Sequence, residues 1–299
     1  MSLLRVFATC TFLCVFSALQ LQAQKATCTN WNLWLLNPAD PRNPLEQADG
    51  VNDNRTVVGL SYPLSSKLMP PYWGFVHYFS GKVTYWHPAN AKKSWFTGRN
   101  NVGNTVGNYI DTLGVLHAAY LHGSTTSLIV HPKAVHHSTY LIEVNNLNTI
   151  LGVYSGSDGV NHLFKRRSNG TFLSVPNFPG AQVTYAGAFN DNGVVVGGYI
   201  LPGDPGDIQR GFIYRNGSFA PVNYRNTFTH TDLVGIDNNG VIVGNWYANG
   251  FLYKNGVFKD IVGPHGEYVT ARGISANGII TGDISSKSMA THGFTATCQ

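Results

Sequence analysis

The nine residues Phe189–Gly197, with the sequence FNDNGVVVG, and their counterpart Ile236–Gly244, IDNNGVIVG, decide the fold of this chain. Each segment joins a turn of Asn, Asp and Gly to a β-branched run that ends in glycine. A third copy is Ile274–Gly282, ISANGIITG, and weaker copies occupy residues 51–59, 100–107 and 144–152. The closing glycines are spaced 48, 45, 45, 47 and 38 residues apart, which gives six units of about 45 residues. These glycines are Gly59, Gly107, Gly152, Gly197, Gly244 and Gly282.

The rest of each unit predicts three further chain features in a fixed order. A variable loop follows the second strand, and a third strand then starts near a pair such as Gly211-Phe212. An Asn-Gly hairpin turn, such as Asn216-Gly217, leads into a fourth strand. Four antiparallel strands in each of six units predict an all-β, six-bladed β-propeller. A seven-bladed ring would need a unit that the sequence lacks, and a five-bladed ring would leave one copy unexplained. A linear β-solenoid is the main rival, although its coils usually repeat at shorter periods.

The composition agrees with this fold. The 299 residues include 33 glycines and 28 asparagines but three glutamates, and 12% of them are charged. Such a chain is a poor candidate for a helical bundle, a coiled coil, an α/β fold or a highly charged disordered protein. The 43% hydrophobic content suffices for a core.

Residues 1–23 resemble a secretory signal peptide. Arg5 supplies positive charge, Val6–Leu19 is apolar, and Leu21-Gln22-Ala23 is a plausible cleavage site. The alternative is a membrane anchor, for which the apolar run is short. We therefore expect one propeller domain over residues 24–299, secreted or periplasmic, with the choice between these compartments open.

The two chain ends are expected to close the ring. The last unit has strands near residues 272–275, 279–283 and 292–298 but no fourth strand. The segment Cys28–Leu36 precedes the first unit and can supply the missing outer strand. Cys28 would then face Cys298, and an oxidising compartment would favour a disulfide between them. Lipidation of Cys28 is the alternative, but the residues before it lack the expected pattern.

The repeat resembles a known family. The segment Phe189–Tyr199 is similar to the INDxGxVVGxY core of the bacterial HAF-type extracellular repeats, and His292-Gly293-Phe294 resembles the tripeptide that names them. Pro179-Gly180-Ala181 matches a linker that is common in that family. The similarity covers roughly residues 48–296 and is best in the last three units. It implies a propeller-like repeat protein outside the bacterial cytoplasm, and it transfers no catalytic residue.

Charge and ligand patterns exclude several kinds of site. The net charge of +5 is dispersed, and no basic stripe with interleaved aromatics suggests nucleic-acid binding. The Asn-Asp-Asn-Gly turns could suggest calcium, but they lack a twelve-residue set of oxygen ligands, so a hairpin turn is the better interpretation. His136-His137, with His131 nearby, have no carboxylate or cysteine at ligand spacing. We expect no metal and no cofactor.

Catalytic motifs are equally hard to find. Glu46, Glu143 and Glu267 lie in different units, and the sequence holds no nucleophile elbow, HExxH motif, phosphate loop or dinucleotide fingerprint. No catalytic residue is predicted, although a propeller can bring distant loops together at its axis.

Binding residues are predicted at strand ends and in long loops. The aromatics Tyr109, Tyr154, Tyr199 and Trp246 each follow a closing glycine by two residues. They could line a sugar-binding rim or simply pack on a neighbouring blade. The longest loops are residues 61–73 and 200–210, and the second contains Asp204 and Asp207.

The sequence favours a non-catalytic binding scaffold for a glycan, a peptide or a protein. A propeller hydrolase or lyase acting on polysaccharide is the first alternative, and a structural protein of the cell envelope is the second. The ligand and the oligomeric state stay open.

Overall fold

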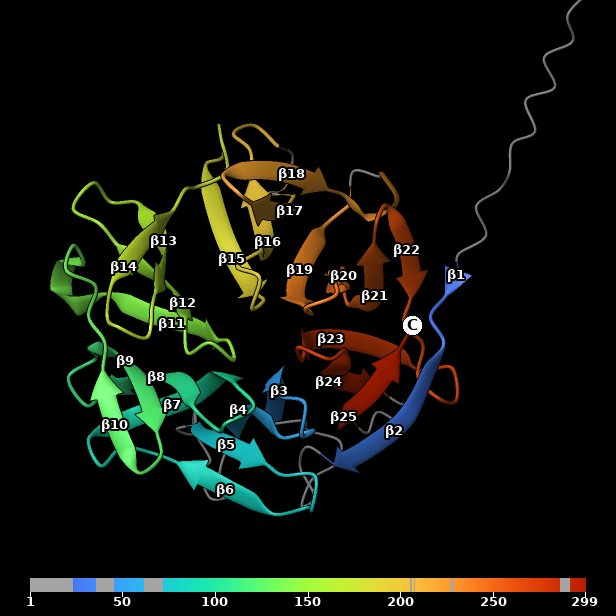
Figure 1. Cartoon of the computed structure of the whole chain (residues 1–299), viewed down its shortest axis with the longest axis horizontal. Helices are drawn as coiled ribbons and strands as arrows, with labels where there is room; N and C mark the ends of the chain where they lie inside the picture. The colour runs from blue at the N-terminus through green and yellow to red at the C-terminus, as the bar shows by residue number, and fades with distance from the viewer. Residues whose placement is uncertain are drawn as a thin grey trace, which may run out of the picture.

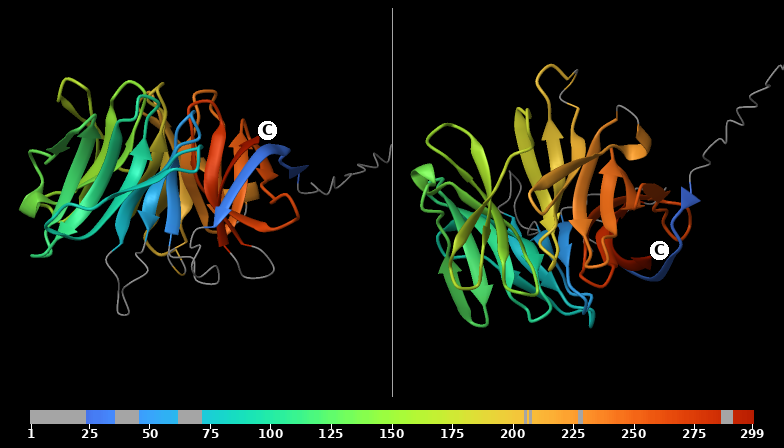
Figure 2. Two further views of the ribbon diagram at one scale, coloured as in Figure 1. Left: turned by 90° about the horizontal axis from the view of Figure 1, so that it is seen from below. Right: turned by 45° about the horizontal axis from the view of Figure 1, so that its top comes forward.

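The structure is a computed structural model that describes residues 24–35, 46–61, 72–204, 206, 208–226, 229–285 and 291–299. The predicted signal peptide, residues 1–23, lies outside the described residues. Six antiparallel sheets surround a central axis (Figure 1), with the first strand of each sheet innermost. The predicted six-bladed β-propeller with four-stranded blades is thus confirmed. Seen from the side, the strands run between the two faces of a disc (Figure 2).

The first three blades each use four consecutive strands. Blade 1 is β3 (Glu46–Val51), β4 (Val57–Ser61), β5 (Trp73–His77) and β6 (Val83–Trp86). Blade 2 is β7 (Ala91–Arg99), β8 (Thr105–Asp111), β9 (Leu116–His122) and β10 (Thr125–Leu128). Blade 3 is β11 (Thr139–Val144), β12 (Ile150–Ser155), β13 (Asn161–Arg166) and β14 (Phe172–Val175), and the 3-10 helix η1 (Val135–His137) precedes it.

The last three blades follow the same order until the chain ends. Blade 4 is β15 (Val183–Phe189), β16 (Val195–Ile200), β17 (Arg210–Arg215) and β18 (Ser218–Val222), and η3 (Tyr224–Asn226) follows it. Blade 5 is β19 (Thr231–Ile236), β20 (Ile242–Trp246), β21 (Asn249–Lys254) and β22 (Val257–Asp260). Blade 6 is β23 (Tyr268–Ile274), β24 (Ile279–Ser285), β25 (Thr291–Cys298) and the N-terminal strand β2 (Cys28–Leu35).

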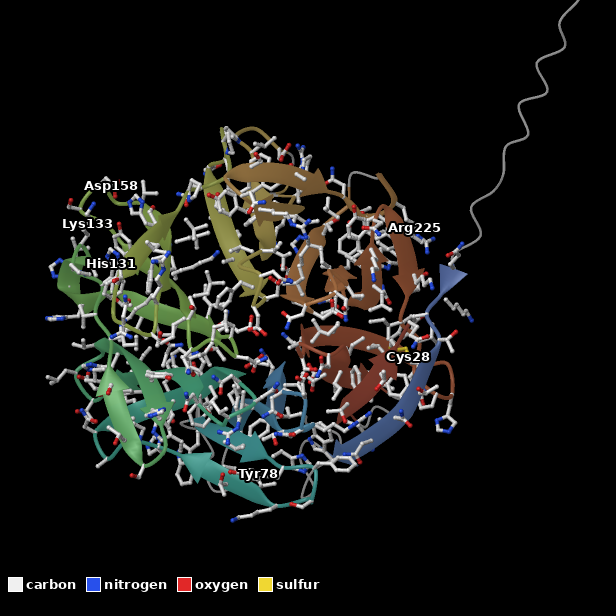
Figure 3. All side chains as sticks on the ribbon, viewed as in Figure 1. Cys28, Tyr78, His131, Lys133, Asp158 and Arg225 are labelled. Atoms are coloured by element: carbon white, nitrogen blue, oxygen red, sulfur yellow. A yellow bond between two sulfur atoms is a disulfide. The ribbon has the colours of Figure 1, made fainter. Side chains whose placement is uncertain are left out.

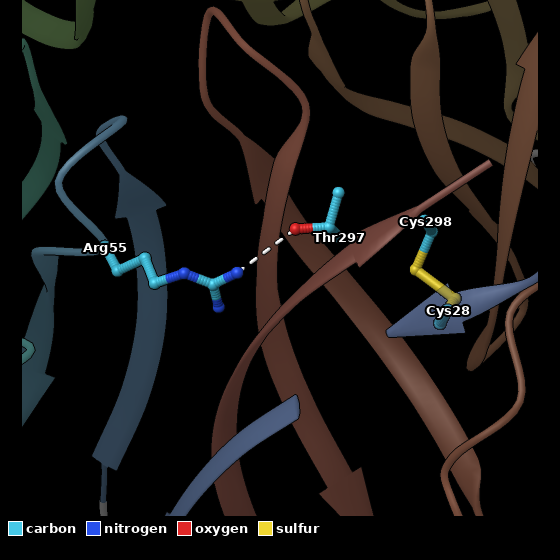
Figure 4. Close-up of a disulfide and its surroundings, with 4 residues drawn as sticks. All are labelled: Cys28, Arg55, Thr297 and Cys298. Atoms are coloured by element: carbon cyan, nitrogen blue, oxygen red, sulfur yellow. Dashed lines mark hydrogen bonds between the residues drawn. A yellow bond between two sulfur atoms is a disulfide. The ribbon is translucent and has the colours of Figure 1, made fainter. Parts of the chain in front are cut away.

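The ring closes as the sequence predicts. Strand β2 pairs antiparallel with β25, with Cys28 opposite Cys298, and a disulfide joins these cysteines across 270 residues of sequence (Figure 4). A disulfide is typical of proteins outside the reducing cytoplasm. The preceding strand β1 (Gln24–Lys25) pairs parallel with β22, so the N-terminal segment touches blades 5 and 6.

Arg55 fastens the same closure from the side of blade 1. Its guanidinium donates to Thr297 Oγ1 at 3.1 Å (Figure 4). It also donates to Asn30 O at 2.9 Å and Thr295 Oγ1 at 3.2 Å. Arg55 occupies the turn position that is glycine in the best copies of the repeat, and its φ of +56° lies in the left-handed region. This side chain therefore ties blade 1 to both strands that close blade 6.

The hydrophobic core lies between neighbouring blades. The phenylalanine that follows the predicted start of the third strand is fully buried in five blades, as Phe75, Phe164, Phe212, Phe251 and Phe294. Each of these rings helps to fill a contact layer between sheets, which buries both faces of every blade.

The Asn/Asp turns link one blade to the next. Within its own turn, Asn190 Oδ1 accepts from the Val194 N–H at 3.0 Å, and its Nδ2 donates to Asp237 O in the next blade at 2.9 Å. Asn52 and Asn100 donate forward to the next blade in the same way. We call the face of the disc that holds these turns the turn face, and the opposite face the loop face.

Two turn aspartates extend this network. Asp191 accepts from the Asn146 N–H at 2.8 Å and from Asn238 Nδ2 at 2.7 Å, so its carboxylate joins blades 3, 4 and 5. Asp53 accepts from the Asn277 N–H at 2.9 Å across the junction of blades 6 and 1. N–H donors thus surround these carboxylates, and they act as blade-to-blade links. In the described part of the chain, no group of three or more His, Cys, Asp or Glu side chains is placed to hold a metal ion.

Candidate functional site

A cavity of about 540 Å³ lies on the propeller axis, between the inner strands of all six blades. It is also lined by Tyr72 and Gln209, which end the two longest loops. Because Tyr72 and Gln209 precede the ends of β5 and β17 that lie at the loop face, the cavity opens there and narrows toward the turns. At the turn face the remaining space is about 30 Å³, enough for about one water molecule. The cavity is therefore a funnel with one wide mouth.

A β-bulge in every inner strand shapes this funnel. Each inner strand skips one residue opposite the closing glycine of the second strand, and β7 skips a further residue, Lys92, near its start. Bulges turn a side chain out of the regular alternation. The six residues skipped next to the closing glycines all line the funnel, and they are Asp49, Thr97, Ile142, Gly187, Val234 and Arg272.

The closing glycines make these bulges possible. Each closing glycine pairs with the residue just before the bulge, as Gly197 pairs with Ala186. A Cβ on Gly197 would overlap Tyr185 O, and a Cβ on Gly59 would overlap Gln47 O. The glycine that marks the repeat thus leaves room for the bulge, and the bulge aims a side chain at the axis.

A second tier lies two residues before each bulge, nearer the mouth. In five blades this residue lines the funnel, and the five are Gln47, Trp95, Tyr140, Tyr185 and Asp232. The tier is chemically divided: blades 2, 3 and 4 contribute aromatic rings, whereas blades 5 and 1 contribute an acid and an amide. The funnel therefore has an aromatic arc and a polar arc.

The aromatic arc is a continuous surface. Trp95 Nε1 donates to Tyr140 Oη at 3.1 Å, and the two ring centroids are 6.1 Å apart. Tyr72 contacts Trp95 edge-on, with centroids 5.6 Å apart. Burial raises the pKa of Tyr140 to about 12, so its hydroxyl stays protonated at neutral pH. Tyr185 continues the arc with 45% of its surface exposed.

The polar arc holds two carboxylates, each bonded to a glutamine. Gln47 Nε2 donates to Asp49 Oδ1 at 2.6 Å, and Gln209 Nε2 donates to Asp232 Oδ1 at 2.8 Å. Burial in the funnel wall raises the pKa of Asp49 to about 7, although the glutamine amide and the charge of Arg272 oppose this. Burial raises the pKa of Asp232 as well. Asp49 can therefore exchange a proton near neutral pH.

Arg272 is the permanent cation of this arc. Its Nε donates to Asp283 Oδ2 at 3.0 Å in the neighbouring strand of the same blade. Its charge also lowers the pKa values of Asp49 and Asp232, which burial nevertheless leaves raised. One guanidinium therefore serves three carboxylates.

Glu143 occupies the narrow end of the channel, next to the bulge of β11. Its Oε2 accepts from the Phe189 N–H at 3.1 Å. Burial, together with the nearby Asp191 charge, raises the pKa of Glu143 to about 8. The narrow space around it leaves no room for an organic ligand.

The predicted aromatic column lies away from the funnel, within the blades. Tyr199 stacks on Phe178 with centroids 3.6 Å apart, and Tyr154 stacks on His131 at 3.7 Å. Trp246 stacks on Tyr224, and Tyr109 stacks on His117. In blades 3, 4 and 5 the partner ring comes from the segment that crosses from the preceding blade. These contacts are those of the packing interpretation, and Tyr109 and Tyr199 are buried.

The other predicted residues lie at separate places. Asp204 accepts from Arg210 Nη2 at 2.6 Å in the loop before β17. Asp207 lies outside the described residues. His131 is buried toward the outer part of the disc (Figure 3). The structure does not bring these groups together with the aromatic column into one site.

The funnel residues are not among those predicted from the sequence, although they stand at a fixed spacing from the closing glycines. Every bulge residue lies ten positions before a closing glycine, and every second-tier residue lies twelve positions before it. The bulge position holds a different residue type in every unit, and the second-tier position repeats only as Tyr140 and Tyr185, so neither position stands out as a repeat.

Comparison with known proteins supports the fold. No protein-family model matches the chain, and no curated protein matches its sequence. Among solved structures, a lectin from Aleuria aurantia in complex with Fucα1-6GlcNAc is 11% identical, with a TM-score of 0.51 over 85% of this chain and 94% of the lectin. Another structure of this fungal lectin, described as a six-bladed β-propeller with a fucose recognition mode, gives a TM-score of 0.50 at 11% identity, over 85% and 93% of the two chains.

A virginiamycin B lyase from Staphylococcus aureus is 9% identical, with a TM-score of 0.48 over 89% of this chain and 99% of the lyase. The lectin similarity shows the propeller fold alone. Among the described residues, no helix is long and apolar enough to cross a membrane.

Proposed function

We propose that this chain is an exported, non-catalytic binding protein that holds a glycan in its axial funnel. The observation that carries the proposal is the divided wall of the funnel, with aromatic rings on blades 2 to 4 and, opposite them, two acids, two glutamines and Arg272. The volume of about 540 Å³ falls within the range of about 300–1,000 Å³ that is typical of small-molecule sites.

The two arcs suit the two kinds of surface on a sugar. A carboxylate such as Asp49 accepts hydrogen bonds from hydroxyl groups, and the amides of Gln47 and Gln209 can both donate to hydroxyls and accept from them. The rings of Trp95 and Tyr140 offer flat apolar area opposite them, with polar edges that can still hydrogen-bond. The Aleuria lectin shows that a propeller of this architecture can accommodate a glycan in at least one protein.

Export is part of the proposal. The apolar segment at residues 6–19 and the disulfide between Cys28 and Cys298 both favour a compartment outside the cytoplasm. We also propose membership of the HAF-type repeat family, which rests on the turn segments and the His292–Phe294 tripeptide. N-terminal sequencing of the exported protein tests the cleavage near residue 23.

A glycan-array screen followed by calorimetry tests the function. We expect at least one glycan to bind, Trp95→Ala to weaken its binding about tenfold or more, and Tyr85→Ala to leave it unchanged. Tyr85 is a matched control because its ring is 55% exposed on the outermost strand of blade 1, far from the axis. If Trp95→Ala binds as well as the wild type, the ligand is not in the funnel.

A hydrolase or lyase acting on polysaccharide is the second candidate, and Asp49 favours it. A carboxyl group with a pKa of about 7 can serve as a general acid or base at neutral pH. The test is release of new sugar ends from a bound glycan. A release that is lost in Asp49→Asn, while binding persists, would replace the binding role by catalysis.

A further inference from the structure

The funnel holds more acidic than basic side chains, whereas the chain as a whole is positively charged. The protein as a whole carries a net charge of +5. The polar arc nevertheless gathers Asp49, Asp232 and Asp283 around one permanent cation, Arg272. Since low-dielectric walls focus the field of these acidic side chains, the mouth of the funnel attracts positive charge.

The two carboxylates of the funnel wall feel the charge of Arg272 but form no direct ion pair with it. Among the described residues, Asp49 and Asp232 form no ion pair within 4 Å, whereas Asp283 is paired with Arg272. Each of these two carboxylates accepts a hydrogen bond from the neutral amide of a glutamine. The charge of Arg272 lowers the pKa values of Asp49 and Asp232, and His230 lowers that of Asp232. A buried carboxylate without a paired cation is costly, and a bound cation would remove that cost.

The aromatic arc faces the same space as these acids. Asp49 and Tyr140 line the same cavity, and the charge of Asp49 helps to raise the pKa of Tyr140. Ring faces attract cations, so Trp95, Tyr140 and Tyr185 reinforce the preference set by the acids. Both walls of the funnel therefore favour a positively charged group.

We propose that the ligand is an amino sugar, a sugar ring that carries a protonated primary amine, with the amine between Asp49 and Asp232 and the ring against the aromatic arc. This proposal rests on the proposed glycan-binding function. A lysine side chain carries the same charge, but its thin methylene chain would leave much of the 540 Å³ funnel and the broad surface of Trp95 and Tyr140 uncovered.

Calorimetry with four probes tests the proposal. The probes are a glucosamine oligosaccharide, the N-acetylglucosamine oligosaccharide of the same length, spermidine and a lysine-rich peptide. We expect the glucosamine oligomer to bind about tenfold more tightly than its acetylated form, because acetylation removes the charge. Its affinity should also fall as salt is raised, which needs no variant protein.

Variants locate the amine. Asp49→Asn and Asp232→Asn should each cut the affinity for the glucosamine oligomer about tenfold and remove most of its advantage over the acetylated oligomer. Asp158→Asn is the matched control, because this aspartate lies at the outer rim of the disc with its side chain 55% exposed (Figure 3). Circular dichroism confirms that the variants fold.

The outcomes separate the two proposals. Equal binding of the acetylated and deacetylated oligomers would refute the amino sugar and leave the glycan function standing. Binding of the peptide or of spermidine, but of neither sugar, would refute the glycan function itself. Tight binding of the glucosamine oligomer that survives both aspartate substitutions would place the amine elsewhere and overturn the inference.

Discussion

Reducing the disulfide between Cys28 and Cys298 is the sharpest test of how the ring is held shut. The bond spans 270 residues of sequence, so it removes a very large loop from the unfolded ensemble. Chain-entropy arithmetic for a loop of that length gives about 5–6 kcal/mol at 25 °C. The folded ring keeps its other fastenings, since β2 still pairs with β25 and Arg55 still bonds both strands. The loss should therefore appear chiefly as lower resistance to unfolding.

The assay is urea unfolding followed by tryptophan fluorescence. With a slope of about 3 kcal/mol/M, the double variant Cys28→Ala/Cys298→Ala should unfold at about 2 M lower urea than the oxidised protein. A reducing agent should lower the midpoint of the wild type by a similar amount and leave the double variant unchanged, which controls for other effects of the reductant. Equal midpoints for oxidised protein and double variant would show that the entropic argument does not apply to this ring.

Three further changes test the structure elsewhere. Glu143→Gln keeps an acceptor for the Phe189 N–H. Because the pKa of Glu143 in the folded protein is raised to about 8, the wild type should lose stability relative to this variant as pH rises from about 4.5 to 8. Thermal melts of both proteins in a series of buffers measure this difference. Phe164→Ala, at a fully buried ring, should cost about 3–5 kcal/mol in urea unfolding. Arg55→Gly relieves a positive φ but loses three hydrogen bonds, so we expect a net loss of about 2 kcal/mol. Asn255→Gly, at a positive φ in an exposed hairpin turn, should lose nothing and serves as its control.

The fold was predictable because its determinants repeat. The turn asparagine, the closing glycine and the buried phenylalanine perform the same task in nearly every blade, as Asn190, Gly197 and Phe212 do in blade 4. Repetition turns weak local signals into a strong one, and the incomplete last unit then predicted the pairing of β2 with β25. Closure followed from counting strands, and the disulfide followed from closure.

The site was not predictable in the same way. A bulge leaves no mark on a strand of this length, so the alternation of residues 183–189 does not reveal that Gly187 faces the axis. The aromatic column drew attention because it repeats, yet its members stack within blades, as Tyr199 does on Phe178. In blades 3, 4 and 5 these repeated rings serve a contact that is itself repeated, the stacking on a ring of the segment that crosses from the preceding blade. Six identical side chains on an axis would make a symmetric site, whereas a glycan has different groups on its different sides.

Function in this propeller should therefore reside where the six units differ. Arg55 departs from the glycine of the best repeat copies, and it bonds the two strands that close the ring, which is a contact specific to the first unit. The bulge positions also differ between units: Asp49 and Arg272 are charged, whereas Ile142 and Val234 are apolar. The scaffold fixes where these six residues face, and it leaves their chemistry largely free because the repeated turns and core rings hold the blades together. That separation lets one funnel combine acids with aromatics while the blades around it keep the same architecture.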